Sequence, residues 1–481
     1  MKLEVLSLLA LGCVSASAQF KPDFKLKADD FTVLMGVDAQ LTDGLKRAPL
    51  NGHGKFHVYD WNNAKQAATW KITSGEAAKH EVFVLIRRAN NQPLVFSLDA
   101  AAGHSIHATL PANPGRWQRV KLDGLLDIPA GESSVSLHIA AADGKADFNA
   151  ELHAVELIRP AVRSELARRA LAMRADPTWF QNARYGMMVH WTKQSMPLNG
   201  DPKPYAQAVA DFDVEAFADA MKSTGAGFVV VTTSHAMQYF PAPIKALDAI
   251  IPGRTTARDL PADLAAALNK RGLKLFLYFH LGASDDAEWL KASGFWETDT
   301  SKFFGNWKSI ISEIGERYGD KLAGWWFDDG ATNYYYRSAP WEALDKAAKV
   351  GNPQRLVGFN AWELCNPTEF HDYCTNEGGA DPRGIEPLLT PASNGRYPSG
   401  SHAGLQASAC LIADSTWLHT SKNTPPSGPR WNADQLAELL KGFIALKNVP
   451  IFNLEITQDG QLSPQSLAVF RQASAKLQSS P

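Results

Sequence analysis

Residues 214–233, VEAFADAMKSTGAGFVVVTT, place an amphipathic helical pattern directly before an apolar run that is typical of a buried strand. The same alternation of strand and helix continues through the chain from Arg184 onward. Parallel strands need crossover connections about as long as a helix, so this alternation predicts a parallel sheet. The strand-like runs are residues 185–191, 227–233, 273–281, 322–329, 355–361, 370–377, 409–414 and 450–456.

Eight strand candidates in roughly 280 residues favour a (β/α)8 barrel over a doubly wound sheet, which usually has fewer strands and a glycine-rich phosphate turn. The sequence contains no GxGxxG and no Walker motif. We therefore assign residues 161–481 to a (β/α)8 barrel. Such a barrel carries its catalytic groups at the carboxyl ends of its strands.

Residues 19–160 have a different pattern, in which short runs alternate apolar and polar residues between turns rich in Gly, Asn, Pro and Asp. This alternation predicts an antiparallel β-sandwich, so the expected fold is multidomain, an all-β unit before an α/β barrel. The sandwich either binds carbohydrate or is a purely structural unit packed on the barrel. A helical stretch, 164–183, interrupted at Asp176-Pro177, is expected to connect the two units. The alternating runs are residues 55–61, 80–88, 94–100, 133–141 and 150–158.

Residues 1–18, MKLEVLSLLALGCVSASA, combine one lysine, an apolar stretch too short to span a bilayer, and small residues at Ala16 and Ala18. This pattern is typical of a secretory signal peptide cleaved after Ala18, so we expect a secreted or periplasmic protein. ALGC around Cys13 resembles a lipoprotein box only loosely. No later segment is long and apolar enough to cross a membrane.

The charged residues exclude some partners. The formal net charge is −2, from 48 basic and 50 acidic side chains without long runs of one sign. This balance gives no electrostatic basis for binding nucleic acid or an anionic membrane, and a neutral substrate or an uncharged polymer fits better. The sequence leaves the oligomeric state open.

Three cysteines, Cys365, Cys374 and Cys410, remain after the signal segment. An odd number allows at most one intrachain disulfide, so the chain does not depend on a disulfide framework. His371 and Asp372 lie near the first two cysteines, but their spacing matches no standard zinc pattern, and a disulfide or buried thiols remain the simpler interpretation. We predict no metal and no cofactor.

Polar and aromatic residues follow the predicted strands where a barrel would hold its active site. Each one alone has a structural explanation, but together they describe a sugar-binding pocket, because sugar rings present apolar C–H faces for stacking and hydroxyls for hydrogen bonding. In strand order they are His190 and Trp191; Ser234 and His235; Tyr278, Phe279 and His280; Asp328 and Asp329; Asn360 and Trp362; Asp372, Tyr373 and Glu377.

The acidic pair in GWWFDDG, residues 324–330, suggests glycoside hydrolysis by two carboxylates. Successive side chains of a strand point to opposite faces, so Asp328 shares a face with Trp326, whereas Asp329 faces the other way and can cap a following helix. Asp328 is therefore the predicted nucleophile, and Trp326 is a predicted neighbour of the sugar.

Several motifs resemble those of the retaining α-L-fucosidases of glycoside hydrolase family 29, over about residues 175–475. WWFDDG resembles the W-x-D-G element that holds the nucleophile of that family, which implies this role for Asp328. DYCTNE resembles the D-Y-x-T-P-E element, which implies that Glu377 is the acid/base, with Glu363 and then Glu369 as alternatives. The other similar stretches are RYGMMVHW (184–191), residues 212–235, GLKLFLYFHL (272–281) and residues 448–462.

Two positions depart from that family pattern. Ala236 stands where the family usually has a second histidine, and Trp362 stands where it often has an arginine. The resemblance implies an exo-glycosidase that hydrolyses terminal α-L-fucosides with retention and binds a glycan substrate. The two departures keep open an α-L-galactosidase-type specificity, and also a non-catalytic carbohydrate-binding protein on a degenerate barrel. The substrate-binding residues expected from both lines of reasoning are His190, Trp191, His235, Tyr278, His280, Trp326, Asn360 and Trp362.

Overall fold

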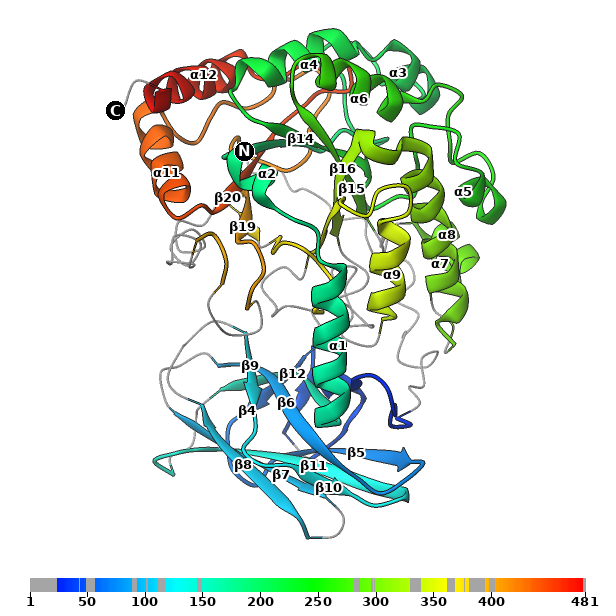
Figure 1. The fold of residues 1–481 in the computed structure, drawn as a ribbon, viewed down its shortest axis with the longest axis vertical. Helices are drawn as coiled ribbons and strands as arrows, with labels where there is room; N and C mark the ends of the chain where they lie inside the picture. The colour runs from blue at the N-terminus through cyan, green and yellow to red at the C-terminus, as the bar shows by residue number, and fades with distance from the viewer. Residues whose placement is uncertain are drawn as a thin grey trace, which may run out of the picture.

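The computed structural model describes residues 24–42, 44–48, 57–88, 93–100, 103–110, 117–144, 149–280, 286–295, 297, 299–328, 339–360, 368–375, 377–379, 394–397 and 403–478. Two antiparallel sheets precede a larger unit built on one parallel sheet. In Figure 1 the antiparallel sheets lie at the bottom, the parallel sheet and its helices lie at the top, and the connecting helix α1 runs between them. Within these segments, no helix has both the length and the apolar character that crossing a bilayer requires.

The antiparallel sheets share one hydrophobic core, as the alternation in the sequence predicts. In β7, for example, buried residues alternate regularly with half-buried ones. One sheet contains β1 (Thr32–Met35), β3 (Lys46–Arg47), β4 (Val58–Trp61), β6 (Ala78–Arg88), β9 (Gln118–Lys121), β10 (Leu126–Ile128) and β12 (Ala150–Ile158). The other contains β2 (Gln40–Leu41), β5 (Ala67–Ser74), β7 (Leu94–Ala100), β8 (Ser105–Leu110) and β11 (Gly131–Ala141), and the short helix η2 (Gly36–Asp38) lies between β1 and β2.

Helix α1 (Pro160–Met173) connects the sandwich to the parallel unit. It starts at a proline, whose missing N–H costs nothing in the first helical turn. Arg163 forms an ion pair with Glu81 of β6, which ties the start of the helix to the sandwich. Just beyond the far end, the backbone N–H of Ala175 donates to the Asp372 carboxylate at 2.7 Å, which ties the connector to the parallel unit.

The parallel sheet contains eight strands in the order β17-β16-β15-β14-β13-β20-β19-β18. They are β13 (Gly186–Val189), β14 (Phe228–Ser234), β15 (Lys274–His280), β16 (Leu322–Asp328), β17 (Leu356–Phe359), β18 (Glu377–Gly379), β19 (Ser408–Ile412) and β20 (Val449–Leu454). The strands alternate with helices that cover the outer face of the curled sheet (Figure 1). After the short α2 (Thr178–Asn182), these are α3 (Tyr205–Asp211), α4 (Val214–Ser223), α5 (Lys245–Ile250), α6 (Leu260–Lys270), α7 (Ala287–Ser293), α8 (Ser301–Tyr318) with η3 (Gly319–Lys321), α9 (Trp341–Ala348), α11 (Ala433–Ala445) and α12 (Pro464–Gln478).

The sheet is curled, and the closed barrel expected from the sequence is observed in part. No hydrogen-bonded ladder joins β17 to β18 in the described part of the chain. Two backbone hydrogen bonds place the segment before β18 between β17 and the residues that precede β19: Asp372 N–H donates to the Val357 carbonyl at 2.8 Å, and Cys374 N–H donates to the Gln406 carbonyl at 2.9 Å. The eight parallel strands are confirmed, and full closure stays a prediction.

Alternation along each strand separates an inner from an outer set of side chains. In β16, Trp325 and Phe327 belong to the large core beneath the helices, whereas Trp326 belongs to the core inside the curl. Asp328 follows Trp326 by two residues and therefore shares its inner face.

Two glycines let large rings fill the inside of the curl. Gly186 pairs with Phe228, and Gly324 pairs with Phe276 on the neighbouring strands. A Cβ atom would lie 2.2 Å from the Phe228 ring at the first glycine and 2.3 Å from the Phe276 ring at the second. Phe180 of α2 lies 4.9 Å from Phe228 between ring centroids and completes this packing.

Candidate active site

Asp328, at the carboxyl end of β16, is held by two side-chain donors and is only 8% exposed. The Tyr278 hydroxyl donates to Oδ2 at 2.5 Å, and the Asn360 amide donates to Oδ1 at 2.7 Å. Asn360 is itself held by the Thr375 hydroxyl, which donates to its amide oxygen at 3.2 Å. Because each oxygen has a different donor, the carboxylate is fixed in orientation, as a catalytic carboxylate requires.

Aromatic and imidazole rings surround this carboxylate. Tyr278 stacks on Trp326 with centroids 5.0 Å apart and an interplanar angle of 12°. The ring of His190 lies 5.0 Å from that of Tyr278 and 5.5 Å from that of His235, and His235 lies 5.2 Å from His280. The structure thus brings together side chains from the ends of β13, β14, β15, β16 and β17, which is the edge expected to hold a barrel's active site.

His190 is neutral over most of the pH range. It is 3% exposed, and burial, with a smaller contribution from His280, lowers its pKa to about 4. Its Nδ1 lies 2.6 Å from the side-chain oxygen of Asn453 on β20. The centroid of the Trp417 ring lies 5.4 Å from that of His190.

Sequence reasoning did not select Asn453 or Trp417. Asn453 interrupts the apolar run PIFNLEI near the end of the last strand, and this interruption is the signal that could have identified it. Trp417 comes five residues after the end of β19, where an aromatic residue alone gives no indication of its direction.

Trp191 does not join this group, which corrects the assignment made from the sequence. His190 points inward, so the next residue points outward. Trp191 packs on Phe212 with centroids 5.0 Å apart, and its indole N–H donates to the Gln458 carbonyl at 3.0 Å. Its donor and its ring are therefore used in the core beneath the helices.

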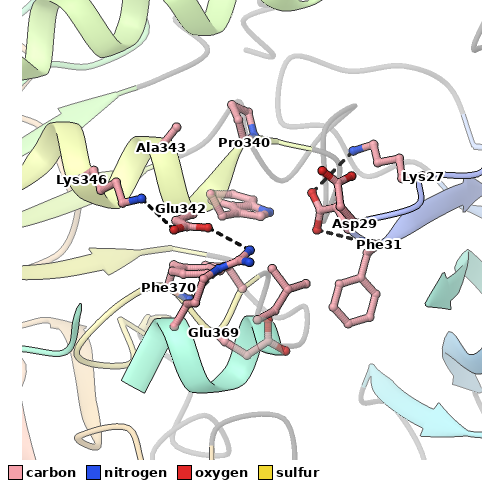
Figure 2. Close-up of a pocket in the computed structure, with 14 residues that line it drawn as sticks. Lys27, Asp29, Phe31, Pro340, Glu342, Ala343, Lys346, Glu369 and Phe370 are labelled. Carbon is pink, nitrogen blue, oxygen red and sulfur yellow. Dashed lines mark hydrogen bonds and ion pairs between the residues drawn. The ribbon is translucent and has the colours of Figure 1, made fainter. Parts of the chain in front are cut away.

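The structure describes only some of the residues proposed as the acid/base. Glu377 begins β18, where its backbone pairs with Cys410, but its side chain is outside the described residues. Trp362 and Glu363, and also Asp329, lie outside the described residues altogether. Glu369 lines a cleft of about 500 Å³ at the junction with the sandwich, whose wall also includes Lys27, Phe31 and Phe370 (Figure 2). Glu369 therefore lies at the junction, and its role as the third acid/base alternative stays a prediction.

Asp372 and Tyr373 have structural contacts. Asp372 is fully buried and accepts hydrogen bonds from the backbone N–H groups of Ala175 and Val357 and from Lys349. The Tyr373 hydroxyl donates to the Trp325 carbonyl at 2.8 Å. These residues therefore join the strands beneath the site.

The cysteine region forms no recognisable metal centre in the described segments. Cys374 and Cys410 are buried thiols without a disulfide, and Cys365 lies outside the described residues. No group of three or more His, Cys, Asp or Glu side chains suited to a metal ion is found in that part of the chain.

The chain is similar to a protein-family model and to curated proteins. A family model described as Alpha-L-fucosidase matches residues 203–475. Tissue alpha-L-fucosidases of Macaca fascicularis and Homo sapiens are 28% identical over 148 residues, which cover 23% of this chain and 31% of theirs. The match thus spans about a third of the length of these curated relatives.

Two solved structures are similar to part of this chain. An alpha-L-fucosidase from Lactobacillus casei in complex with its α-L-fucose product has a TM-score of 0.44 and 18% identity, covering 62% of this chain and 96% of that one. A glycoside hydrolase family 29 alpha-L-fucosidase from Bacteroides thetaiotaomicron has a TM-score of 0.46 and 16% identity, covering 63% and 74%.

Proposed function

Because this chain belongs to the alpha-L-fucosidase family, we propose that it hydrolyses terminal α-L-fucosides. The observation that best supports this proposal is the position of Asp328, which Tyr278 and Asn360 hold at the carboxyl end of a parallel strand. The partly exposed rings of His235 and Trp417 offer contact surface, and the imidazole nitrogens offer hydrogen-bonding atoms. Both suit a neutral sugar with apolar and hydroxylated faces.

The proposed reaction proceeds with retention in two displacements. In the first, an Asp328 oxygen forms a bond to the anomeric carbon while the bond to the leaving oxygen breaks, and the Glu377 carboxyl gives its proton to that oxygen. In the second, the Glu377 carboxylate takes a proton from water, the water oxygen bonds to the anomeric carbon, and Asp328 is released. Neither displacement requires a cofactor.

We also propose that the eight strands close into a full barrel through residues 371–375. The two backbone hydrogen bonds of this segment, to Val357 and to Gln406, support closure because they connect it to β17 on one side and to the residues before β19 on the other. Closure would bring Glu377 on β18 to the same end of the barrel as Asp328.

The proposed mechanism is tested by following hydrolysis of an aryl α-L-fucoside by NMR. We expect α-L-fucose as the first product in the wild type, and loss of at least about three orders of magnitude in kcat for Asp328→Gly. Adding azide to this variant should restore turnover and form β-L-fucosyl azide, because azide enters from the side that the carboxylate had occupied. Asp329→Asn is the matched control and should retain activity. Full activity in Asp328→Gly, or β-L-fucose as the first product, would contradict the mechanism.

The sugar specificity is a finer part of the proposal. Ala236 is buried near the site, where a methyl group cannot hydrogen-bond a sugar hydroxyl. We therefore expect aryl α-L-galactoside, which differs from the fucoside only at C6, to be a substrate as well. Comparing kcat/KM for the two glycosides decides between the specificities.

We further propose that the protein is exported, on the basis of the signal-like pattern in residues 1–18. Mass spectrometry of the mature protein from an exporting host should find Gln19 at the N-terminus. An intact Met1 would contradict export by this route.

A further inference from the structure

We propose that Asn453 is a positioning residue for the hydrolysis proposed above: its amide fixes the tautomer of His190 and holds the backbone that carries Trp417. One side chain would then set two walls of the sugar pocket. This inference rests on the proposed function, which it extends to a residue that does not itself touch the sugar.

The orientation of the Asn453 amide follows from its partners. The residue is fully buried on β20, and its Nδ2 lies 3.2 Å from the carbonyl oxygen of Thr416 and 3.1 Å from that of Trp417. Carbonyl oxygens can only accept, so the two N–H groups of the amide must face them. The amide oxygen therefore faces His190, whose Nδ1 lies 2.6 Å away.

This orientation assigns the proton of His190. The amide oxygen can only accept, so Nδ1 must carry the hydrogen. A neutral imidazole has one N–H, so Nε2 keeps a lone pair and can accept a hydrogen bond from a sugar hydroxyl. The titratable side chains that face the ring are His235, which directly follows β14, and Tyr278 and His280 on β15. Asp328 of β16 is hydrogen-bonded to Tyr278.

The same amide controls the aromatic wall. Trp417 is partly exposed, and its ring is tilted by 54° to that of His190. It lies on the loop after β19, and Asn453 binds the carbonyl oxygens of two consecutive loop residues. Loss of the amide would therefore release the loop and the imidazole together.

An aspartate at this position would have a different effect from an alanine. A carboxylate has no N–H for the two carbonyls, and its charge favours the protonated imidazole. His190 would then keep protons on both nitrogens up to a higher pH than in the wild type. In that form its Nε2 cannot accept a hydrogen bond.

The test compares the pH dependence of kcat/KM for an aryl α-L-fucoside from about pH 4 to about pH 8. We expect the acid limb of Asn453→Asp to lie at least about one pH unit above that of the wild type, whereas Asn453→Ala loses about tenfold at every pH. Asn448→Asp is the matched control, since Asn448 is also buried but lies beside the first residue of the same strand, and its acid limb should stay in place. If Asn453→Asp merely lowers kcat/KM equally at every pH, the role is only structural and the proposal is wrong.

A second measurement does not depend on activity. In protein labelled with ¹⁵N-histidine, the wild type should show a protected Nδ1–H signal that disappears in His190→Gln and in Asn453→Ala. If this signal is present but aryl fucosides are not hydrolysed, the proposed function fails and the positioning role stands. If His190 instead carries its proton on Nε2, the positioning role fails whatever the activity.

Discussion

Tyr278 contributes two contacts at one position, because its ring stacks on Trp326 while its hydroxyl donates to Asp328. Tyr278→Phe removes only the second contact. A hydrogen bond to a charged group contributes about 1.5 to 3 kcal/mol, so we expect kcat/KM for aryl α-L-fucoside to fall about 10- to 100-fold. Steady-state kinetics with a thermal melt of the same sample measure the effect on activity and on stability separately.

A matched control for this change is Tyr373→Phe. Tyr373 is also buried and donates its hydroxyl hydrogen, but to the Trp325 carbonyl. This variant should lose stability without a comparable loss of activity. Equal kinetic losses in both variants would mean that the hydroxyl of Tyr278 has no special relation to Asp328.

His190 should make stability depend on pH. Burial lowers its pKa from 6.5 to about 4, so the unfolded chain binds a proton more readily than the folded chain between these values. The contribution of this residue is therefore complete above pH 6.5 and is lost as the pH falls toward 4, by up to about 3 kcal/mol. His190→Asn keeps a donor near Nδ1 but cannot titrate, and its free energy of unfolding should decrease less than that of the wild type over this range. Parallel curves from urea unfolding at several pH values would contradict the assignment.

At the scale of elements, Arg355 joins two helices and a strand. It is fully buried, and its guanidinium donates to the carbonyl oxygens of Leu322, Ala348, Val350, Gly315 and Gly319. Burial lowers its pKa to about 10, so it remains charged near neutral pH, where it complements the carboxyl ends of α8 and α9. Arg355→Met would leave these carbonyl groups without their donors, and we expect a loss of about 3 to 5 kcal/mol in the free energy of unfolding.

Arg168→Met on α1 provides the comparison for Arg355. Its partner is Glu165, three residues earlier, and its side chain is 69% exposed, so its loss should cost less than about 1 kcal/mol. Denaturant unfolding of both variants measures the difference. A similar small effect at Arg355 would show that water replaces the guanidinium without penalty.

The strand pattern also explains which site residues the sequence could predict. The parallel strands follow from the alternation of strand and helix along the chain, and the inward direction of Asp328 follows from the alternation of side chains along a strand. Both patterns are local in the sequence. The same side-chain alternation places Trp191 outward. The prediction that Trp191 lies in the pocket with His190 was therefore wrong, because consecutive residues at a strand end point to opposite faces. Asn453 meets His190 across 263 residues of sequence, and no local pattern reports a contact between the first and last strands.

At the scale of the whole molecule, the sandwich and the parallel unit share a junction with a cleft. Its wall includes positive side chains from Lys27, Arg169 and Lys346, and negative ones from Asp29, Asp30, Glu342 and Glu369 (Figure 2). A wall that mixes charges of both signs in this way suits a neutral, hydroxylated ligand better than a polyanion. If the sandwich assists glycan binding here, Ala343→Trp, which fills the cleft, should weaken binding of long neutral oligosaccharides about tenfold in calorimetry and leave aryl fucoside turnover unchanged.

Leu171→Trp controls for the added indole. Leu171 is on α1 like the cleft residue Arg169, but it is 66% exposed and is not part of the cleft wall. This variant should bind oligosaccharides as the wild type does. Equal affinities in the wild type and in Ala343→Trp would favour a purely structural sandwich.

The paired glycines and phenylalanines inside the curl have a consequence for how such sequences diverge. Each pair joins two neighbouring strands, Gly186 with Phe228 and Gly324 with Phe276. In each pair only a glycine leaves room for the ring of its partner. A methyl group at Gly324 should be harmful alone and tolerated once Phe276 becomes leucine, since the volume is exchanged across the ladder. Over evolutionary time the two members of each pair should therefore change together, and a lineage that loses one of these rings should acquire a bulkier residue at the partner position.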